Sequence, residues 1–303
     1  MRTVCLINNY NYSAYLHECL QSVERQSRRF DRVIVVDDGS TDDSRSIIES
    51  FCDRLDGWEA LCKPNGGQLS CFNACLHHVE RDDVVTFLDA DDVYPVDYLE
   101  LLMARVHQRP ADFYFGEYVF FRHGVERPID TACKEDAADV LIPCSSSLSR
   151  RFRAWMGSPT SAIAVSGRLM HELLPYPHER DWITRADDVL VIGASLLGVA
   201  KLYMPGVRVA YRVHGANGYH GRKYDEAYRV QREHRLQKLF GWYCHKQLIP
   251  LRTSAMVAAR EHALIPDRYL SRFGLEPREI RGLLPFRVRL SLWNMRRKQA
   301  KGV

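Results

Sequence analysis

The chain has 303 residues, of which 46% are hydrophobic, 26% charged and 11% aromatic. This composition is typical of a folded domain, and it excludes a disordered chain, a collagen, a coiled coil and a polytopic membrane protein. Forty-two basic residues against 38 acidic ones leave a net charge of only +4. Such a small surplus gives no reason to expect a nucleic-acid partner.

The longest nearly apolar run, Val189–Ala200, is too short to cross a bilayer, and the first residues do not have the pattern of a signal peptide. Nine cysteines are scattered along the chain without a Cys-x-x-Cys pair. This pattern is typical of reduced thiols in a cytoplasm. We therefore expect a cytoplasmic protein without structural zinc.

Short β-branched runs alternate with helical patterns through the first 115 residues. Ser13 is the expected N-cap of the first helix, and Ser40 or Thr41 that of the second. Alternation at this spacing predicts βαβ units, and therefore an α/β fold with a mostly parallel sheet. The predicted strands are Thr3–Ile7, Val33–Val36, Trp58–Cys62 and Val84–Leu88, and the helices Tyr15–Val23, Ile47–Phe51, Leu69–Val79 and Pro95–Val106.

The pattern is looser in the second half, which we interpret as an elaboration of the same domain. We expect one domain over residues 1–218, with halves at 1–115 and 116–218, followed by a helical, basic region at 219–303. The predicted strands here are Phe113–Phe121, Ser161–Val165, Leu202–Met204 and Val207–Val213, and the helices Gly167–Leu174 and Asp187–Leu197.

Aspartates follow two of the four N-terminal strands. Asp37 and Asp38 end the second strand, and Asp89, Asp91 and Asp92 end the fourth. Ligands of open parallel sheets bind beyond the carboxyl ends of the strands, and residues i and i+2 of extended backbone point the same way. Oxygen ligands suit Mg²⁺ or Mn²⁺, which one or two carboxylates can hold together with phosphate oxygens. The alternative is that these acids are solvated turns and helix caps.

No glycine-rich phosphate loop accompanies these acids. The chain has neither Gly-x-Gly-x-x-Gly after the first strand nor Gly-x4-Gly-Lys-Ser/Thr anywhere. Any bound phosphate would therefore be neutralised by a metal rather than by a glycine loop.

Several linked motifs then occur in a fixed order, and residues 3 to about 218 resemble family 2 glycosyltransferases with a GT-A fold. The motifs of the second half resemble a bacterial branch of that family. The motifs of the first half are Asn9-Tyr10-Asn11, Tyr15-Leu16 through Gln26, Val35-Val36-Asp37-Asp38-Gly39-Ser40-Thr41-Asp42, Asn65-Gly66-Gly67-Gln68, Asn73 and Phe87-Leu88-Asp89-Ala90-Asp91-Asp92. Those of the second half are Pro159-Thr160-Ser161-Ala162, Arg185-Ala186-Asp187 and Tyr211-Arg212-Val213-His214-Gly215.

The resemblance implies a nucleotide-binding half at 1–115 and an acceptor-side half at 116–218. It implies that Asp38 accepts a hydrogen bond from the base of a nucleotide, and that Asn9 and Tyr10 help to hold the base and ribose. Gln68 and Asp89 are also placed at the nucleotide. Asp89 and Asp91 would carry Mn²⁺ or Mg²⁺ on the donor diphosphate, with Asp91 the more direct ligand and His214 a possible third. The resemblance implies no role for Asp92.

Inverting sugar transfer needs a base that takes the proton of the attacking hydroxyl. The family places this aspartate at the start of a helix, where Asp187 and Asp188 stand. We favour Asp187 because Gly198 and Pro205 follow it at the family's spacing of about eleven and eighteen residues. Ala186 replaces the glutamate of many members, so Asp188 stays as a substitute. Without the resemblance, two acids at a helix N-terminus would simply complement its dipole.

The resemblance implies an inverting, metal-dependent glycosyltransferase. It would move a sugar from a nucleotide-diphosphate sugar, with UDP as the first candidate nucleotide, to a hydroxyl of a saccharide or glycolipid in cell-surface polysaccharide synthesis. Residues 278–301 interleave basic and apolar side chains, a pattern that could lie on the inner face of an anionic membrane. A solvated helix that packs by one side is the alternative.

Two other functions stay open. A nucleotidyltransferase would make a nucleotide sugar, although such enzymes usually carry a glycine-rich basic loop where this chain has Asn9-Tyr10-Asn11. A non-catalytic nucleotide-sugar-binding module would keep the pocket without turnover, and the intact acids argue against it.

Overall fold

The computed structural model describes residues 1–132, 138–215, 217 and 224–275. The described residues group into two compact units. The first comprises residues within 1–139, 158–189 and 202–224, and the second residues within 140–157, 190–201 and from 225 onwards. The expected division at residue 218 stays a prediction, and the predicted membrane segment 278–301 lies outside the described residues.

The first unit is built on a twisted sheet whose strands follow the order β3-β2-β1-β4-β7-β5-β8. β3, β2, β1 and β4 run parallel, whereas β7 pairs antiparallel with both β4 and β5. The predicted α/β fold with a mostly parallel sheet is therefore confirmed. The strands are β1 Thr3–Asn9, β2 Arg32–Asp37, β3 Trp58–Cys62, β4 Val84–Asp89, β5 Phe113–Arg122, β7 Ile163–Ser166 and β8 Lys201–Val213.

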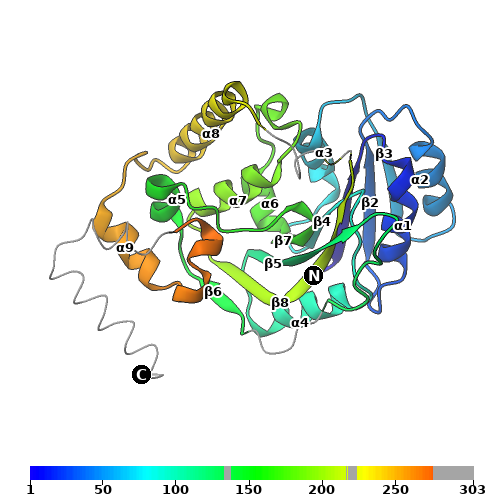
Figure 1. The fold of residues 1–303 in the computed structure, drawn as a ribbon, viewed down its shortest axis with the longest axis horizontal. Helices are drawn as coiled ribbons and strands as arrows, with labels where there is room; N and C mark the ends of the chain where they lie inside the picture. Colours follow the sequence, from blue (N-terminus) through cyan, green and yellow to red (C-terminus); the bar gives the residue numbers. More distant parts are fainter. Residues whose placement is uncertain (133–137, 216, 218–223, 276–303) are drawn as a thin grey trace. The chain divides into compact units, whose positions relative to one another are not determined.

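Helices cover both faces of this sheet, because its buried strands are apolar on both sides. One face packs on α1, α2 and α4 in a single apolar core, to which Ile7, Leu20 and Leu102 belong. On the other face Phe72 of α3 packs against Phe87 of β4, with ring centroids 4.8 Å apart. Figure 1 shows α1 and α2 beside each other. The helices are α1 Ser13–Glu24, α2 Ser44–Cys52, α3 Gln68–Cys75, α4 Tyr98–Gln108, α6 Gly167–Leu173 and α7 Asp187–Leu196, whose last residues belong to the second unit.

The described residues of the second unit are mainly helical, and the helical, basic region expected at 219–303 stays a prediction. Within it, Glu261 accepts hydrogen bonds from the backbone amides of Ser147 and Leu148 and so caps the start of α5. Its elements are β6 Val140–Ile142, α5 Ser146–Phe152, α8 Glu226–Lys246 and α9 Ala255–Ala263. No described helix combines the length and the apolar character that a bilayer crossing requires.

Two local predictions are wrong. The strands expected at 202–204 and 207–213 form the single strand β8, because the fixed φ of Pro205 fits extended backbone. None of Ser13, Ser40 and Thr41 caps a helix through its side chain, and α2 begins only at Ser44. Asp42 does this work instead, since its carboxylate accepts from the amides of Ser13 at 2.9 Å and Ser44 at 3.1 Å.

Candidate active site

Three carboxylates gather where β4 ends. Asp89 is the last residue of β4, and Asp91 and Asp92 follow it in the next turn. One ligand oxygen from each lies within 4.8 Å of the others. Burial, and next the charge of Asp91, raise the pKa of Asp89 to about 7, although hydrogen bonds from Asn8 and Gln68 act against this. A cation at this point would relieve the repulsion, so the donor set fits Mg²⁺ or Mn²⁺.

Asp92 is buried and bound on both oxygens by protein groups. It accepts from Ser161 Oγ at 2.5 Å and from the backbone amide of Arg212 at 2.9 Å. Burial, with repulsion from Asp91 and Asp89, raises the pKa of Asp92 well above its usual range. Asp92 thus ties β8 and the turn at Ser161 to the acidic loop, a role that the sequence did not suggest.

Residues at and just after the end of β8 contact Asp91. His214 Nε2 lies 3.0 Å from Asp91 Oδ2, and Asn217 Nδ2 donates to the same oxygen at 3.2 Å. Arg212 Nε donates to the carbonyl of Asp91 at 2.6 Å, and its Nη2 reaches Glu18 at 2.7 Å. The structure therefore brings His214 to the acid that was predicted as the more direct metal ligand.

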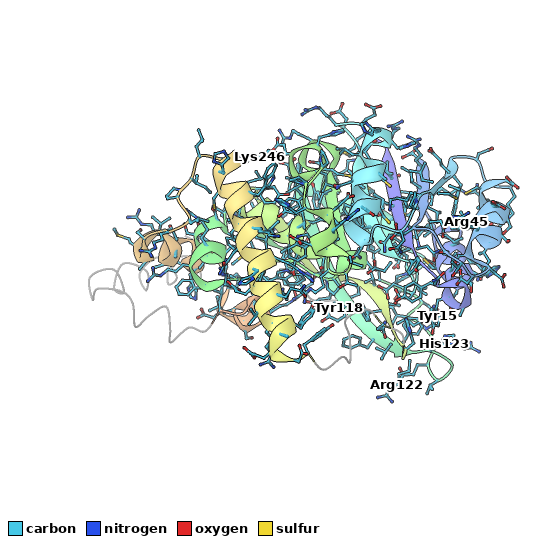
Figure 2. The ribbon with its side chains drawn as sticks, turned by 90° about the horizontal axis from the view of Figure 1, so that it is seen from above. Tyr15, Arg45, Tyr118, Arg122, His123 and Lys246 are labelled. Atoms are coloured by element: carbon cyan, nitrogen blue, oxygen red, sulfur yellow. The ribbon has the colours of Figure 1, made fainter. Side chains whose placement is uncertain are left out.

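Aromatic rings hold His214 in this position. Its ring centroid lies 4.2 Å from that of Tyr15, which also meets His123 edge-on at 4.9 Å. Figure 2 shows Tyr15 and His123 close together, next to Arg122 at the end of β5. Sequence reasoning missed Arg212 and Asn217 as parts of the site. The signal for Arg212 was its place in the motif Tyr211-Arg212-Val213-His214-Gly215, two residues before His214.

The predicted nucleotide side begins at the carboxyl end of β1. Asn9 is buried, and its Nδ2 donates to Asp37 Oδ1 and to Ser40 Oγ, both at 3.1 Å. Asn9 Oδ1 is buried without a hydrogen-bond partner among the described residues. Tyr10 is 45% exposed, so its ring is accessible to a ligand. The contacts of Asn9 and Tyr10 with a base and ribose stay predictions.

Asp38 organises the loop after β3. Its carboxylate accepts from the backbone amides of Gly66 at 2.9 Å and Gly67 at 2.7 Å, and it pairs with Lys63. Gly67 adopts φ +87°, and a Cβ there would meet the Cα of Ile183 at 2.4 Å, so only glycine fits. The predicted contact between Asp38 and a base stays a prediction.

Gln68 links the acidic cluster to the backbone next to Asp187, the residue predicted as the general base. Its Nε2 donates to Asp89 Oδ1 at 2.7 Å and to Thr160 Oγ1 at 3.0 Å. Its Oε1 accepts from the backbone amide of Ala186 at 2.8 Å. Because protein groups engage both ends of this amide, Gln68 acts here as a positioning residue, and the nucleotide contact expected of it stays a prediction.

Asp187 and Asp188 open α7, as expected, but they are held differently. Asp188 has no exposed side-chain surface, and Arg185 Nη2 binds it at 3.0 Å. The Asp187 side chain keeps 12% of its surface exposed and lies 3.9 Å from Arg185 Nε. The charge of Asp187 also contributes to the raised pKa of Asp89, after burial and Asp91. Asp187 is therefore the more accessible of the two acids, and its charge acts on the acidic cluster.

Comparison with known proteins fits this arrangement. The family model described as glycosyl transferase family 2 matches residues 5–131. An uncharacterized glycosyltransferase, alr2836 of Nostoc sp., is 30% identical over 226 residues, which cover 72% of this chain and 67% of that protein.

Solved structures agree with the fold. The structure of S. aureus TarS 1–349 in complex with UDP-GlcNAc matches with a TM-score of 0.62 and 18% identity, covering 98% of this chain and 88% of that one. The mannosyltransferase PcManGT of Pyrobaculum calidifontis, in complex with GDP-Man and Mn²⁺, matches with a TM-score of 0.52 and 19% identity over 80% of this chain and 64% of that one. The sheet with its acidic edge, the family model and the relative of similar extent lead to one conclusion: this chain is a glycosyltransferase and belongs to glycosyl transferase family 2.

Proposed function

We propose that the enzyme is an inverting, metal-dependent glycosyltransferase that uses a nucleotide-diphosphate sugar and a hydroxyl of a saccharide or glycolipid. The observation that carries this proposal is the Gln68 bridge. It joins Asp89 of the acidic cluster to the backbone directly before Asp187. A diphosphate-binding acid and a candidate base are thereby fixed in one site.

Asp89 and Asp91 would hold the divalent ion, with His214 as a third ligand. The fit rests on ligand oxygens of Asp89 and Asp91 within 4.8 Å of each other, on His214 3.0 Å from Asp91, and on the raised pKa of Asp89. When bound, such an ion neutralises the charge that develops on a leaving nucleoside diphosphate. Mn²⁺ accompanies GDP-Man in the structure of PcManGT, which supports Mn²⁺ as the first ion to test here.

Asp187 would serve as the base. In an inverting transfer it takes the proton of the acceptor hydroxyl while the hydroxyl oxygen bonds to the anomeric carbon and the bond to the diphosphate breaks. Its partial exposure supports this role over Asp188, which Arg185 engages. Inversion, the choice of base and a place in cell-surface polysaccharide synthesis are all parts of the proposal.

The donor side would use Asn9, Tyr10 and Asp38 around the base and ribose. UDP is the first nucleotide to test, because the TarS structure contains UDP-GlcNAc. We include in the proposal a cytoplasmic enzyme that can contact the inner face of the membrane through residues 278–301.

Thermal unfolding with UDP, GDP, dTDP or CMP, each with and without Mn²⁺, tests the donor site. A ligand at a hundredfold its Kd stabilises a protein by about 2.7 kcal/mol, which is easily measured. We expect one diphosphate to raise the Tm only with Mn²⁺, and Asp91→Ala to abolish this shift. If none of the nucleotides shifts the Tm, the proposed donor site is wrong.

The base is tested next with nucleotide sugars of the diphosphate found. Asp187→Asn should keep the Mn²⁺-dependent shift and lose release of the diphosphate. Full activity in Asp187→Asn together with its loss in Asp188→Asn would assign the base to Asp188 instead. Incorporation of a sugar phosphate with release of pyrophosphate would support a nucleotidyltransferase.

A further inference from the structure

Three aromatic side chains form a cluster on β5 and β8. The ring centroid of Tyr211 lies 5.8 Å from that of Tyr118 and 5.4 Å from that of Phe120, and the last two are 5.2 Å apart. Phe120 is 47% exposed, and Tyr118 and Tyr211 are partly exposed. Tyr118 lies on β5 a few residues before Arg122 and His123 (Figure 2). We call Tyr118, Phe120 and Tyr211 the aromatic platform.

The register of the sheet places the platform at the same edge as the acidic cluster. Val165 of β7 pairs with both Val85 of β4 and Phe113 of β5, and both pairings are antiparallel. β4 and β5 therefore run in the same direction with Val85 and Phe113 level. Counting forward along both strands puts Tyr118 and Phe120 level with the turn that carries the acids after β4.

β8 is bonded to the acidic turn on both sides of Tyr211. The preceding residue, Ala210, exchanges two backbone hydrogen bonds of 3.0 Å with Val93, and the amide of Arg212 donates to Asp92 at 2.9 Å. The side chain of Tyr211 points away from those of its two neighbours, as alternation along a strand requires. Burial, and then the charges of the four acids Asp92, Asp89, Asp91 and Asp187, raise the pKa of Tyr211 well above its usual range. Tyr211 thus lies within the field of the whole site.

The strands that carry the platform lie on the other side of β4 from β2, and the end of β8 also reaches α1 through Arg212 and Glu18. In the order β3-β2-β1-β4-β7-β5-β8, Asp38 follows β2, the metal-binding acids follow β4, and the platform comes last. A donor whose base is near Asp38 and whose diphosphate is at Asp89 and Asp91 extends toward the platform with its sugar end. This order places the platform where a second substrate, the molecule that receives the donor sugar, would bind.

Partly exposed rings beside carboxylates suit a ligand that has a flat apolar face and hydroxyl groups around its edge. A pyranose ring has this chemistry, since its axial C–H groups can pack on the negative face of an aromatic ring while its hydroxyls reach polar groups. We propose that Tyr118, Phe120 and Tyr211 bind the acceptor saccharide and present one of its hydroxyls to the catalytic acids. This inference rests on the proposed function, because it takes the acidic cluster as the donor diphosphate site.

Binding to an array of immobilised oligosaccharides tests the platform on the full chain, in the presence of Mn²⁺ and a saturating concentration of UDP, GDP or dTDP, whichever raises the Tm. The best glycan found with the wild-type protein is then measured in solution, next to the affinity for the diphosphate. We expect Phe120→Ala to weaken glycan binding about tenfold more than diphosphate binding, and Phe120→Tyr to restore it. Val125→Ala removes an apolar side chain that is 76% exposed just beyond β5 and is the matched control.

The possible failures can be told apart. A protein that binds none of the diphosphates UDP, GDP and dTDP in the presence of Mn²⁺ contradicts the proposed function itself. A protein that binds a diphosphate but no glycan on the array overturns the platform alone. The same holds if Phe120→Ala and Val125→Ala weaken glycan binding equally, or if Phe120→Ala weakens diphosphate binding as much as glycan binding. The last result would place a nucleobase, rather than a sugar, on the rings.

Discussion

Replacement of Gln68 by leucine tests whether one side chain couples the metal-binding acid to the predicted base. Leucine fills similar space but removes two donated hydrogen bonds, to Asp89 and Thr160, and one accepted from Ala186. Each bond contributes about 1 kcal/mol net, and the bond to the carboxylate contributes more. Since Gln68 is partly exposed, these contributions are reduced, and we expect the free energy of unfolding to fall by about 2–4 kcal/mol. Since a catalytic group displaced by about 1 Å can cost a hundredfold in rate, we expect kcat to fall about a hundredfold.

Urea unfolding and release of nucleoside diphosphate measure the two effects, with and without Mn²⁺. Gln68→Glu separates the two ends of the amide, because it keeps the acceptor for Ala186 but sets a second carboxylate against Asp89. Mn²⁺ should therefore restore the stability of Gln68→Glu far more than that of Gln68→Leu. Gln21→Leu on α1 is the control and should change stability by less than about 0.5 kcal/mol. Wild-type stability and kcat in Gln68→Leu would refute the coupling.

Three further predictions concern buried charges. Lys201 Nζ, fully buried in the second unit, lies 2.7–2.9 Å from two carbonyls and Ser195 Oγ, so Lys201→Met should lower the free energy of unfolding by about 2–4 kcal/mol. Burial lowers the pKa of Lys201 well below its usual 10.5. Over the pH range between the two pKa values, the unfolded chain therefore holds a proton that the folded chain does not. The free energy of unfolding, measured with urea, should rise with pH across that range, and this rise should be absent in Lys201→Met. Glu261→Ala removes the cap of α5 and should cost about 1–2 kcal/mol, against a smaller loss in Glu261→Gln, and equal Tm values would contradict the capping role. Asp188→Ala removes the fully covered carboxylate that Arg185 Nη2 binds at 3.0 Å and should lower stability by about 2–3 kcal/mol, even where Asp187→Asn leaves the Tm unchanged.

The sequence predicted the elements that are decided by local pattern. β3 lies at Trp58–Cys62, as its apolar run indicated, and α7 begins at Asp187, as predicted. The acids after β4 could also be placed together, because the carboxyl ends of parallel strands share one edge. These predictions depend on residues close in the chain or on a general rule of sheet geometry, and neither needs knowledge of the packing.

The parts that failed or were missed depend on partners far away in the chain. Ser13 was expected to cap α1 with its own hydroxyl, but Asp42, 29 residues away, binds its amide instead. Asp92 had no predicted role because its partners come from Ser161 and from Arg212, which lies 120 residues away. A short motif identifies which residues are chemically able to act, whereas tertiary packing decides which of them stay accessible.

The pair at the start of α7 illustrates this division most clearly. Asp187 and Asp188 are the same residue type at adjacent positions, so composition and helix-dipole arguments treat them alike. The fold separates them, because Arg185 engages the fully covered Asp188 while the Asp187 side chain keeps 12% of its surface exposed. The salt bridge of Asp188 fixes the backbone at one end of this segment, and Gln68 fixes it at Ala186 on the other. A general base needs a fixed backbone and an accessible carboxylate, and Asp187 has both. The contacts that fix the backbone around Asp187 are therefore as much a part of the proposed site as its carboxylate.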